Sequence, residues 1–150
     1  MTHDAYFSDV TVIANEYNKE INIYADNCLR DDAVLFVNQI YVKTAHLKYK
    51  EYAQFLVLHE LGHLILKHQQ LSIAQKHKMI HQEIQSFYHM QEYEADTFAI
   101  KQMIKLSYEL SGLFQYFSQI KDSESETHPA FKERYQRMYQ QYISVKLSQH

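Results

Sequence analysis

Apolar residues recur along most of the chain at the three- and four-residue steps of an amphipathic helix. This period is clear from position 10 to 21 and predicts a first helix there. The same period predicts later helices over 82–106, 108–120 and 131–145. The polar stretch 121–127 interrupts the pattern and is predicted to be a loop.

Between the helices predicted at 10–21 and 82–106, the hydrophobic pattern changes in two places. Runs of β-branched and aromatic residues at 33–37 and 40–42 predict a hairpin, and Ile23 and Tyr24 predict a further short strand. After Thr44 the helical period returns, with apolar residues on nearly every side. A helix of that kind is buried rather than amphipathic.

Length and composition then indicate the fold class. The chain has 150 residues, of which 46% are hydrophobic, so it can bury one core and is predicted to be a single domain over 1–150. Two glycines and one proline favour long helices over many tight turns. We predict a mostly helical α+β fold, in which a small sheet packs on the buried helix and a helical bundle.

Charge and cysteine content indicate which partners and which cellular compartment to expect. Fifteen basic and eighteen acidic residues give a net charge of -3, so we expect no direct nucleic-acid partner. Cys28 is the one cysteine, and we predict it to be a small buried hydrophobe. The first residues do not resemble a secretory signal, and no apolar run is long enough to span a bilayer. A cytoplasmic protein without a membrane partner is therefore expected.

The candidate chemistry lies on the buried helix, in the sequence His59-Glu60-Leu61-Gly62-His63. Histidines four residues apart project from one face of a helix and can share a metal ion. Glu60 is next to the first histidine, where a general base can reach a water on that ion. Gly62 costs a helix about 1 kcal/mol relative to alanine, which indicates that another element approaches the backbone closely.

A catalytic zinc ion usually has three protein ligands, so a third ligand is needed elsewhere. The extended metzincin pattern would need histidine at position 69, where this chain has Gln69. Among the glutamates after His63, only Glu92 is followed four residues later by an aspartate, Asp96. Glu92 and Asp96 then share a helix face, and an acid at Asp96 can orient a ligating histidine. Glu94 points almost oppositely and is the alternative ligand.

These motifs resemble zinc peptidases of the gluzincin kind. The zinc helix His59–His68, preceded by the run 34–38, is similar to the ImmA/IrrE family of soluble phage and mobile-element peptidases. The segment 92–99 resembles that family too, and is closer to the HtpX and CAAX prenyl protease family. His128-Pro129 followed by Arg134 is similar to a segment of the latter.

The resemblance implies a metallopeptidase with one zinc ion per chain. His59, His63 and Glu92 would bind the ion, Glu60 would be the base, and Asp96 would support a ligand. The oxyanion of the reaction would need a donor, for which His128, Arg134 or a tyrosine are candidates. The predicted function is a zinc-dependent metalloendopeptidase that hydrolyses peptide bonds of a cytoplasmic protein, with a repressor or regulator as one candidate substrate.

Other interpretations remain open at the level of sequence. The first is a non-catalytic interaction module in which zinc only holds helices together, although structural zinc sites usually have four ligands. The second is a helical regulator without metal.

For the peptidase, a substrate peptide is expected to add as a strand beside an exposed edge at 41–43. His77 and His81 repeat the four-residue spacing but are expected to lie on an exposed polar face. The oligomeric state is not indicated.

Overall fold

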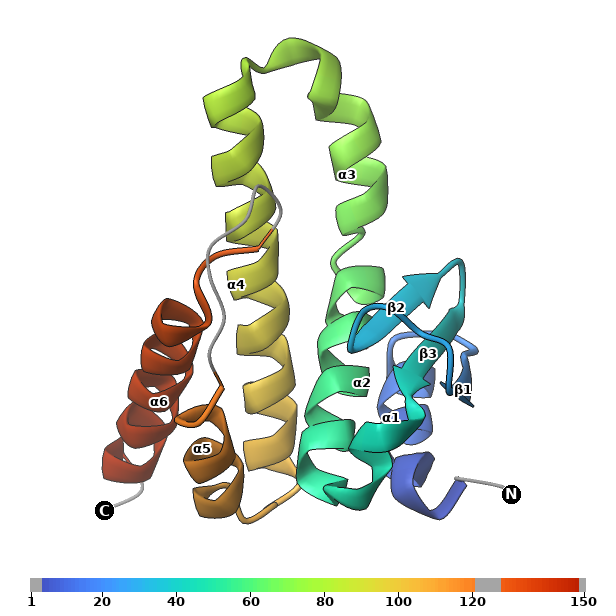
Figure 1. Ribbon diagram of the computed structural model, residues 1–150, viewed down its shortest axis with the longest axis vertical. Helices are drawn as coiled ribbons and strands as arrows, with labels where there is room; N and C mark the ends of the chain where they lie inside the picture. The colour runs from blue at the N-terminus through green and yellow to red at the C-terminus, as the bar shows by residue number, and fades with distance from the viewer. Residues whose placement is uncertain (1–3, 121–127, 149–150) are drawn as a thin grey trace.

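The computed structural model describes residues 4–120 and 128–148 (Figure 1). The elements follow in the order α1 (Asp4–Glu16), β1 (Asn22–Asp26), β2 (Ala33–Phe36), β3 (Gln39–Lys43), the 3-10 helix η1 (Thr44–Lys48), α2 (Lys50–Ile65), α3 (His68–Gln75), the 3-10 helix η2 (Lys76–Lys78), α4 (His81–Lys105), α5 (Ser111–Phe117) and α6 (Phe131–Ser148). The predicted α+β class, mostly helical with a small sheet, is confirmed.

The sheet has the strand order β1-β3-β2. β2 and β3 form the predicted antiparallel hairpin, and β1 pairs in parallel with the other side of β3. The predicted exposed edge at 41–43 is therefore wrong, because these residues lie in the central strand. Ile40 and Val42 alternate with more exposed neighbours and are fully buried, as expected of a sheet with one covered face.

The helices and the sheet are arranged in successive layers (Figure 1). The sheet lies on one side of α2, α4 lies on the other, and α6 packs on the far side of α4. The prediction of a buried helix is confirmed for α2, since every residue from Tyr52 to His59 is buried. This position between sheet and helices brings the His59–His63 segment into the middle of the molecule.

Several predicted boundaries differ from the structure. The first helix ends at Glu16 rather than at 21, because Asn18 has a left-handed φ of 60° that no helix can continue through. Ser107 turns the chain in the same way, and α5 begins at Ser111 rather than 108. Helix α3 was not predicted at all. The loop predicted at 121–127 lies outside the described residues.

Two further expectations concern exposure. Cys28 is exposed, so the prediction of a buried cysteine is wrong; it follows β1 in a loop, where its backbone N–H donates to Asp26. His77 and His81 are exposed, as predicted. Within the described ranges, no helix combines the length and apolar character needed to cross a membrane.

Helices α2 and α4 approach each other closely at Gly62. A Cβ atom added there would lie 3.1 Å from Cδ1 of Phe98 and 3.3 Å from the Cα atom of Ala95. The absence of a side chain at Gly62 therefore allows the backbones of the two helices to approach. This confirms the close approach predicted from Gly62, and it fixes the spacing of the side chains on either side of it.

Candidate metal centre

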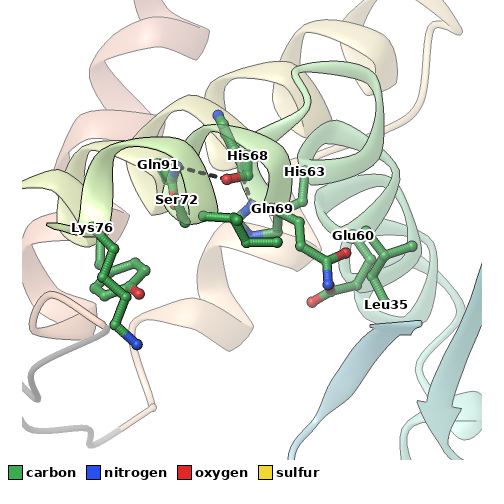
Figure 2. A pocket seen from close by; sticks show the side chains of 10 residues that line it. Leu35, Glu60, His63, His68, Gln69, Ser72, Lys76 and Gln91 are labelled. Atoms are coloured by element: carbon green, nitrogen blue, oxygen red, sulfur yellow. Dashed lines mark hydrogen bonds between the residues drawn. The ribbon is translucent and has the colours of Figure 1, made fainter. Parts of the chain in front are cut away.

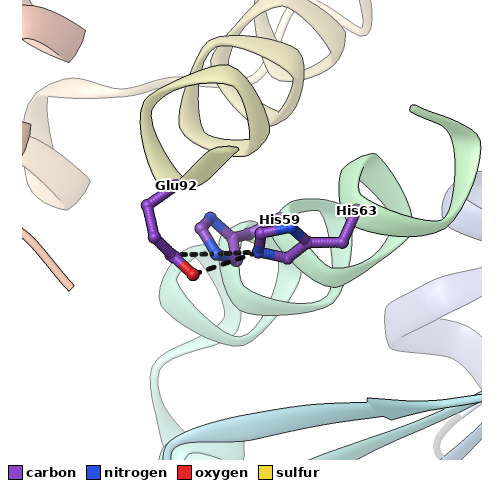
Figure 3. A group of neighbouring side chains, drawn as sticks. All are labelled: His59, His63 and Glu92. Carbon is purple, nitrogen blue, oxygen red and sulfur yellow. Dashed lines mark hydrogen bonds and ion pairs between the residues drawn. The ribbon is translucent and has the colours of Figure 1, made fainter. Parts of the chain in front are cut away.

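Two histidines of α2 and one glutamate of α4 converge on one point (Figure 3). Nε2 of His59 lies 3.1 Å from Nε2 of His63 and 2.9 Å from Oε2 of Glu92, and the other Glu92 oxygen lies 3.3 Å from Nε2 of His63. His59 and Glu92 are buried, and His63 is partly buried. The four-residue spacing of the histidines and the pairing of α2 with α4 produce this arrangement.

The geometry and chemistry of these atoms fit a metal ion. Bonds of about 2.0–2.1 Å to zinc place tetrahedral ligand atoms roughly 3.3 Å apart, close to the three separations in the structure. Within the described part of the chain, Oε2 of Glu92 is buried and makes no hydrogen bond of acceptable geometry, although Nε2 of His59 lies 2.9 Å away. A cation bound among the three side chains would satisfy that oxygen. Imidazole nitrogen and carboxylate oxygen are also the donors that zinc accepts.

Asp96 holds His59 from the side away from this point. One carboxylate oxygen of Asp96 lies 2.8 Å from Nδ1 of His59, and Arg134 of α6 donates to both oxygens at 2.8 Å. Burial would raise the pKa of Asp96, but Arg134 and His59 outweigh it and lower that pKa. The carboxylate is thus charged and can accept a hydrogen bond from Nδ1–H of His59, which leaves Nε2 of His59 directed at Glu92.

The charges around His59 affect its own ionisation. Burial alone would lower the pKa of His59, but the carboxylates of Glu92 and Asp96 overcome it and raise the value to about 10. For Glu92, burial is likewise outweighed by the histidines, and its pKa falls well below the usual range. Without metal, His59 is therefore protonated and carries a positive charge beside the Glu92 carboxylate.

Glu60 lies beside this cluster and faces open space. It lines a cavity of about 410 Å³ together with His63 and His68, and a second of about 400 Å³ together with His59 and Glu92. Figure 2 shows the first of these cavities, with Glu60 near Leu35 of β2. Burial raises the pKa of Glu60, which makes the carboxylate a better proton acceptor than an exposed one.

His68 belongs to the same cluster but was not singled out from the sequence. Its Nδ1 atom lies 2.8 Å from Nδ1 of His63, and the side chain is buried. Burial, together with the nearby His63, lowers the pKa of His68 to about 4, so the ring is neutral. The sequence carries the signal only as a histidine five residues after His63, a spacing that a continuous helix would direct elsewhere.

The two residues named as candidate oxyanion donors lie in different surroundings. His128 is exposed, and its Nε2 atom lies 3.7 Å from a Glu92 oxygen, at the rim of the second cavity. Arg134 is buried, and both of its hydrogen bonds to Asp96 direct its guanidinium toward the His59 side of the site. Glu94, the alternative ligand, is half exposed and lies on the His68 side.

Fold and site together define a small α+β protein with a candidate metal centre between two paired helices, beside the partly buried carboxylate of Glu60 and an open cleft. The sequence model of the Peptidase U49 family matches residues 23–148, which run from the second residue of β1 to the end of α6. The chain belongs to the Peptidase U49 family. No curated protein and no solved structure gives a significant match.

Proposed function

We propose that this chain is a zinc-dependent metalloendopeptidase that hydrolyses peptide bonds of a protein substrate. The observation that carries the proposal is the convergence of His59, His63 and Glu92 beside Glu60, in a chain that belongs to a peptidase family. We assign the first three residues as the ligands of one zinc ion and Glu60 as the catalytic base. The whole chain then acts as one catalytic domain.

Zinc bound at these ligands would lower the pKa of a water molecule and polarise the scissile carbonyl. Glu60 has the position and the raised pKa to take a proton from the attacking water and to pass it to the leaving amine nitrogen. Its two neighbouring cavities give a substrate access on both sides.

Asp96 and Arg134 act on the ligand His59 rather than on the substrate. Asp96 accepts a hydrogen bond from Nδ1–H of His59, which keeps the proton on Nδ1 and the lone pair of Nε2 free for the metal. Arg134 holds Asp96 with two charge-assisted hydrogen bonds, so we assign it this anchoring role in place of oxyanion stabilisation. His128, exposed at the rim of the cleft, is the better candidate for the oxyanion donor.

We propose that the substrate binds as an extended strand along β2. Among the residues that the structure describes, this strand pairs with β3 on one side only, and its residues line both cavities: Leu35 lines the first and Ala33 lines the second. A peptide added to the free edge of β2 would therefore cross the site in front of Glu60. The resemblance to ImmA/IrrE peptidases favours a cytoplasmic regulator or repressor as the substrate.

The alternative function, a zinc-stabilised interaction module, predicts a closed site. The described residues supply a group of three ligands, and a carboxylate with a raised pKa faces the cleft beside them. Structural zinc sites are normally closed by four ligands, so this arrangement favours catalysis.

Metal analysis and one isosteric variant test the proposal. Protein purified without chelators should contain or take up about one zinc ion per chain and should cleave members of a quenched fluorescent peptide library. Glu60→Gln should keep the zinc and the fold but lose hydrolysis, because an amide cannot accept the proton. Glu51→Gln, an exposed change on the same helix, is the matched control and should leave both properties intact. A chain that binds no transition metal, or a Glu60→Gln variant with full activity, would contradict the proposal.

A further inference from the structure

We propose that His68 is a positioning residue that fixes the ring of His63 so that Nε2 of His63 faces the metal. The inference rests on the proposed function, since it takes His63 as a zinc ligand. It adds an element that the His-Glu-x-x-His sequence does not contain. The support is a chain of contacts that runs from α4 through α3 to α2.

The first step is the proton between the two rings. The Nδ1 atoms of His63 and His68 lie 2.8 Å apart, so one of them donates to the other. A neutral imidazole has one donor and one acceptor nitrogen. When Nε2 of His63 binds a metal, its proton must be on Nδ1, and His63 therefore donates to Nδ1 of His68.

The second step concerns which nitrogen of His68 carries its proton. Its Nδ1 is then the acceptor, so its own proton is on Nε2. Within the described ranges, that buried Nε2 atom has no hydrogen-bond partner, and it lies 3.5 Å from a carboxylate oxygen of Glu94. A negative charge on that side favours the tautomer with a proton on Nε2. The surroundings of His68 thus favour the tautomer whose Nδ1 can accept a hydrogen bond from Nδ1 of His63.

The third step is the fixed position of His68. Lys67, between the end of α2 and the start of α3, has a left-handed φ of 59° that interrupts the helix and lets the His68 side chain contact His63. The Gln91 side chain of α4 donates to the backbone carbonyl of His68 at 3.0 Å and accepts from the Ser72 hydroxyl at 3.1 Å (Figure 2). A left-handed conformation costs a residue such as lysine about 1–2 kcal/mol, which the surrounding contacts must offset.

The two histidine ligands are then supported in parallel ways. His59 donates through Nδ1 to Asp96, which Arg134 of α6 anchors, and His63 donates through Nδ1 to His68. Outer partners of this kind set the tautomer and orientation of a ligand, and their loss typically weakens metal binding by about 10 to 100-fold. His68 thus fixes the orientation of His63 as Asp96 fixes that of His59.

Zinc titration against a competing fluorescent chelator tests this role. His68→Leu should weaken zinc binding by about 10 to 100-fold and should change the visible absorption spectrum of the cobalt-substituted protein. His68→Asn should recover most of the affinity, because its side-chain oxygen can accept near the position of Nδ1. His77→Leu replaces an exposed histidine nearby and should change neither property. Native affinity and spectrum in a folded His68→Leu variant would overturn the inference.

The native protein provides a second measurement that needs no stable leucine variant. In zinc-loaded protein with ¹⁵N-labelled histidine, NMR should find the His63 proton on Nδ1 and the His68 proton on Nε2. A His68 proton on Nδ1 would overturn the inference while leaving the zinc site in place. Failure of the native chain to bind zinc would instead contradict the proposed function, so the two failures are distinguishable.

Discussion

His59 is the residue on which most of the charges in the site act. It lies between the carboxylates of Glu92 and Asp96, which stabilise its protonated form and raise its pKa to about 10. Because this pKa is higher than in the unfolded chain, the charged His59 stabilises the metal-free fold. That contribution is fully present below about pH 6.5 and is lost as the pH rises through about 10. At neutral pH a metal ion must therefore displace this proton.

We accordingly predict that zinc binding at pH 7.5 releases about one proton from His59. Calorimetric titrations in two buffers with different ionisation enthalpies would measure it. Asp96→Asn removes one of the two carboxylates that raise the pKa of His59, so this variant should release fewer protons. A binding enthalpy that is the same in both buffers would contradict the prediction. Affinity should also fall on acidification, since the ligands must then compete with protons.

At the scale of elements, the pairing of α2 with α4 sets the geometry of the site. Gly62 lies between the proposed ligands His59 and His63 along the chain and faces Ala95, which lies between Glu92 and Phe98. The close approach of the two backbones at Gly62 brings the proposed ligand atoms of the two helices within 4.8 Å of one another. The two glycines of the chain differ in this respect, because in the described part of the structure no atom of another element lies within 4 Å of a Cβ atom added at Gly112.

We predict opposite effects on stability for the same substitution at these glycines. Gly62→Ala should lower the free energy of unfolding by about 1 kcal/mol, as strain of roughly 1–3 kcal/mol exceeds the gain in helix propensity. It should also weaken zinc binding, because α4 must move away from α2. Gly112→Ala should raise stability by up to about 1 kcal/mol and leave zinc binding unchanged. Urea denaturation of both variants would measure the difference. A Gly62→Ala variant as stabilised as Gly112→Ala would show that the contact does not limit the helix spacing.

At the scale of the whole molecule, the candidate metal site joins layers that are distant in sequence. The histidines are on α2 and Glu92 is on α4, while Arg134 brings in α6 through Asp96. The same α4 carries Gln91, which holds α3 through the His68 carbonyl. Metal binding should therefore stabilise the tertiary structure as a whole and not only one helix.

We predict that zinc raises the melting temperature and that the increase depends on Glu92. Free zinc at about 100 times Kd adds roughly 2.7 kcal/mol, or about 5–10 °C for a chain of this size. Glu92→Ala should lose most of this shift, and Asp96→Ala should reduce it at a given zinc concentration through weaker binding. Glu94→Ala, on the exposed side of the same helix, should keep most of it. Thermal unfolding of the three variants with and without zinc would decide the third ligand, and the reverse order for Glu92 and Glu94 would assign it to Glu94.

Much of this architecture could be predicted from local sequence. Helical periods located α2, α4 and α6, and alternating β-branched residues located the β2–β3 hairpin. The parallel pairing of β1 with β3 could not be predicted, because it joins segments separated by another strand and leaves no local pattern. That pairing makes β3 the central strand, so β2 and not β3 lies at the edge of the sheet beside the cleft.

For the site, sequence determined those features that follow from spacing on one helix. Four-residue steps placed His59 with His63, and Glu92 with Asp96, because a helix turns once every 3.6 residues. Tertiary structure decided which groups from different elements meet. Arg134 reaches Asp96 across 38 positions, and the left-handed Lys67 lets His68 contact His63. Neither contact has a periodic signal, since each depends on how helices pack or on a single backbone dihedral angle that the rest of the fold stabilises.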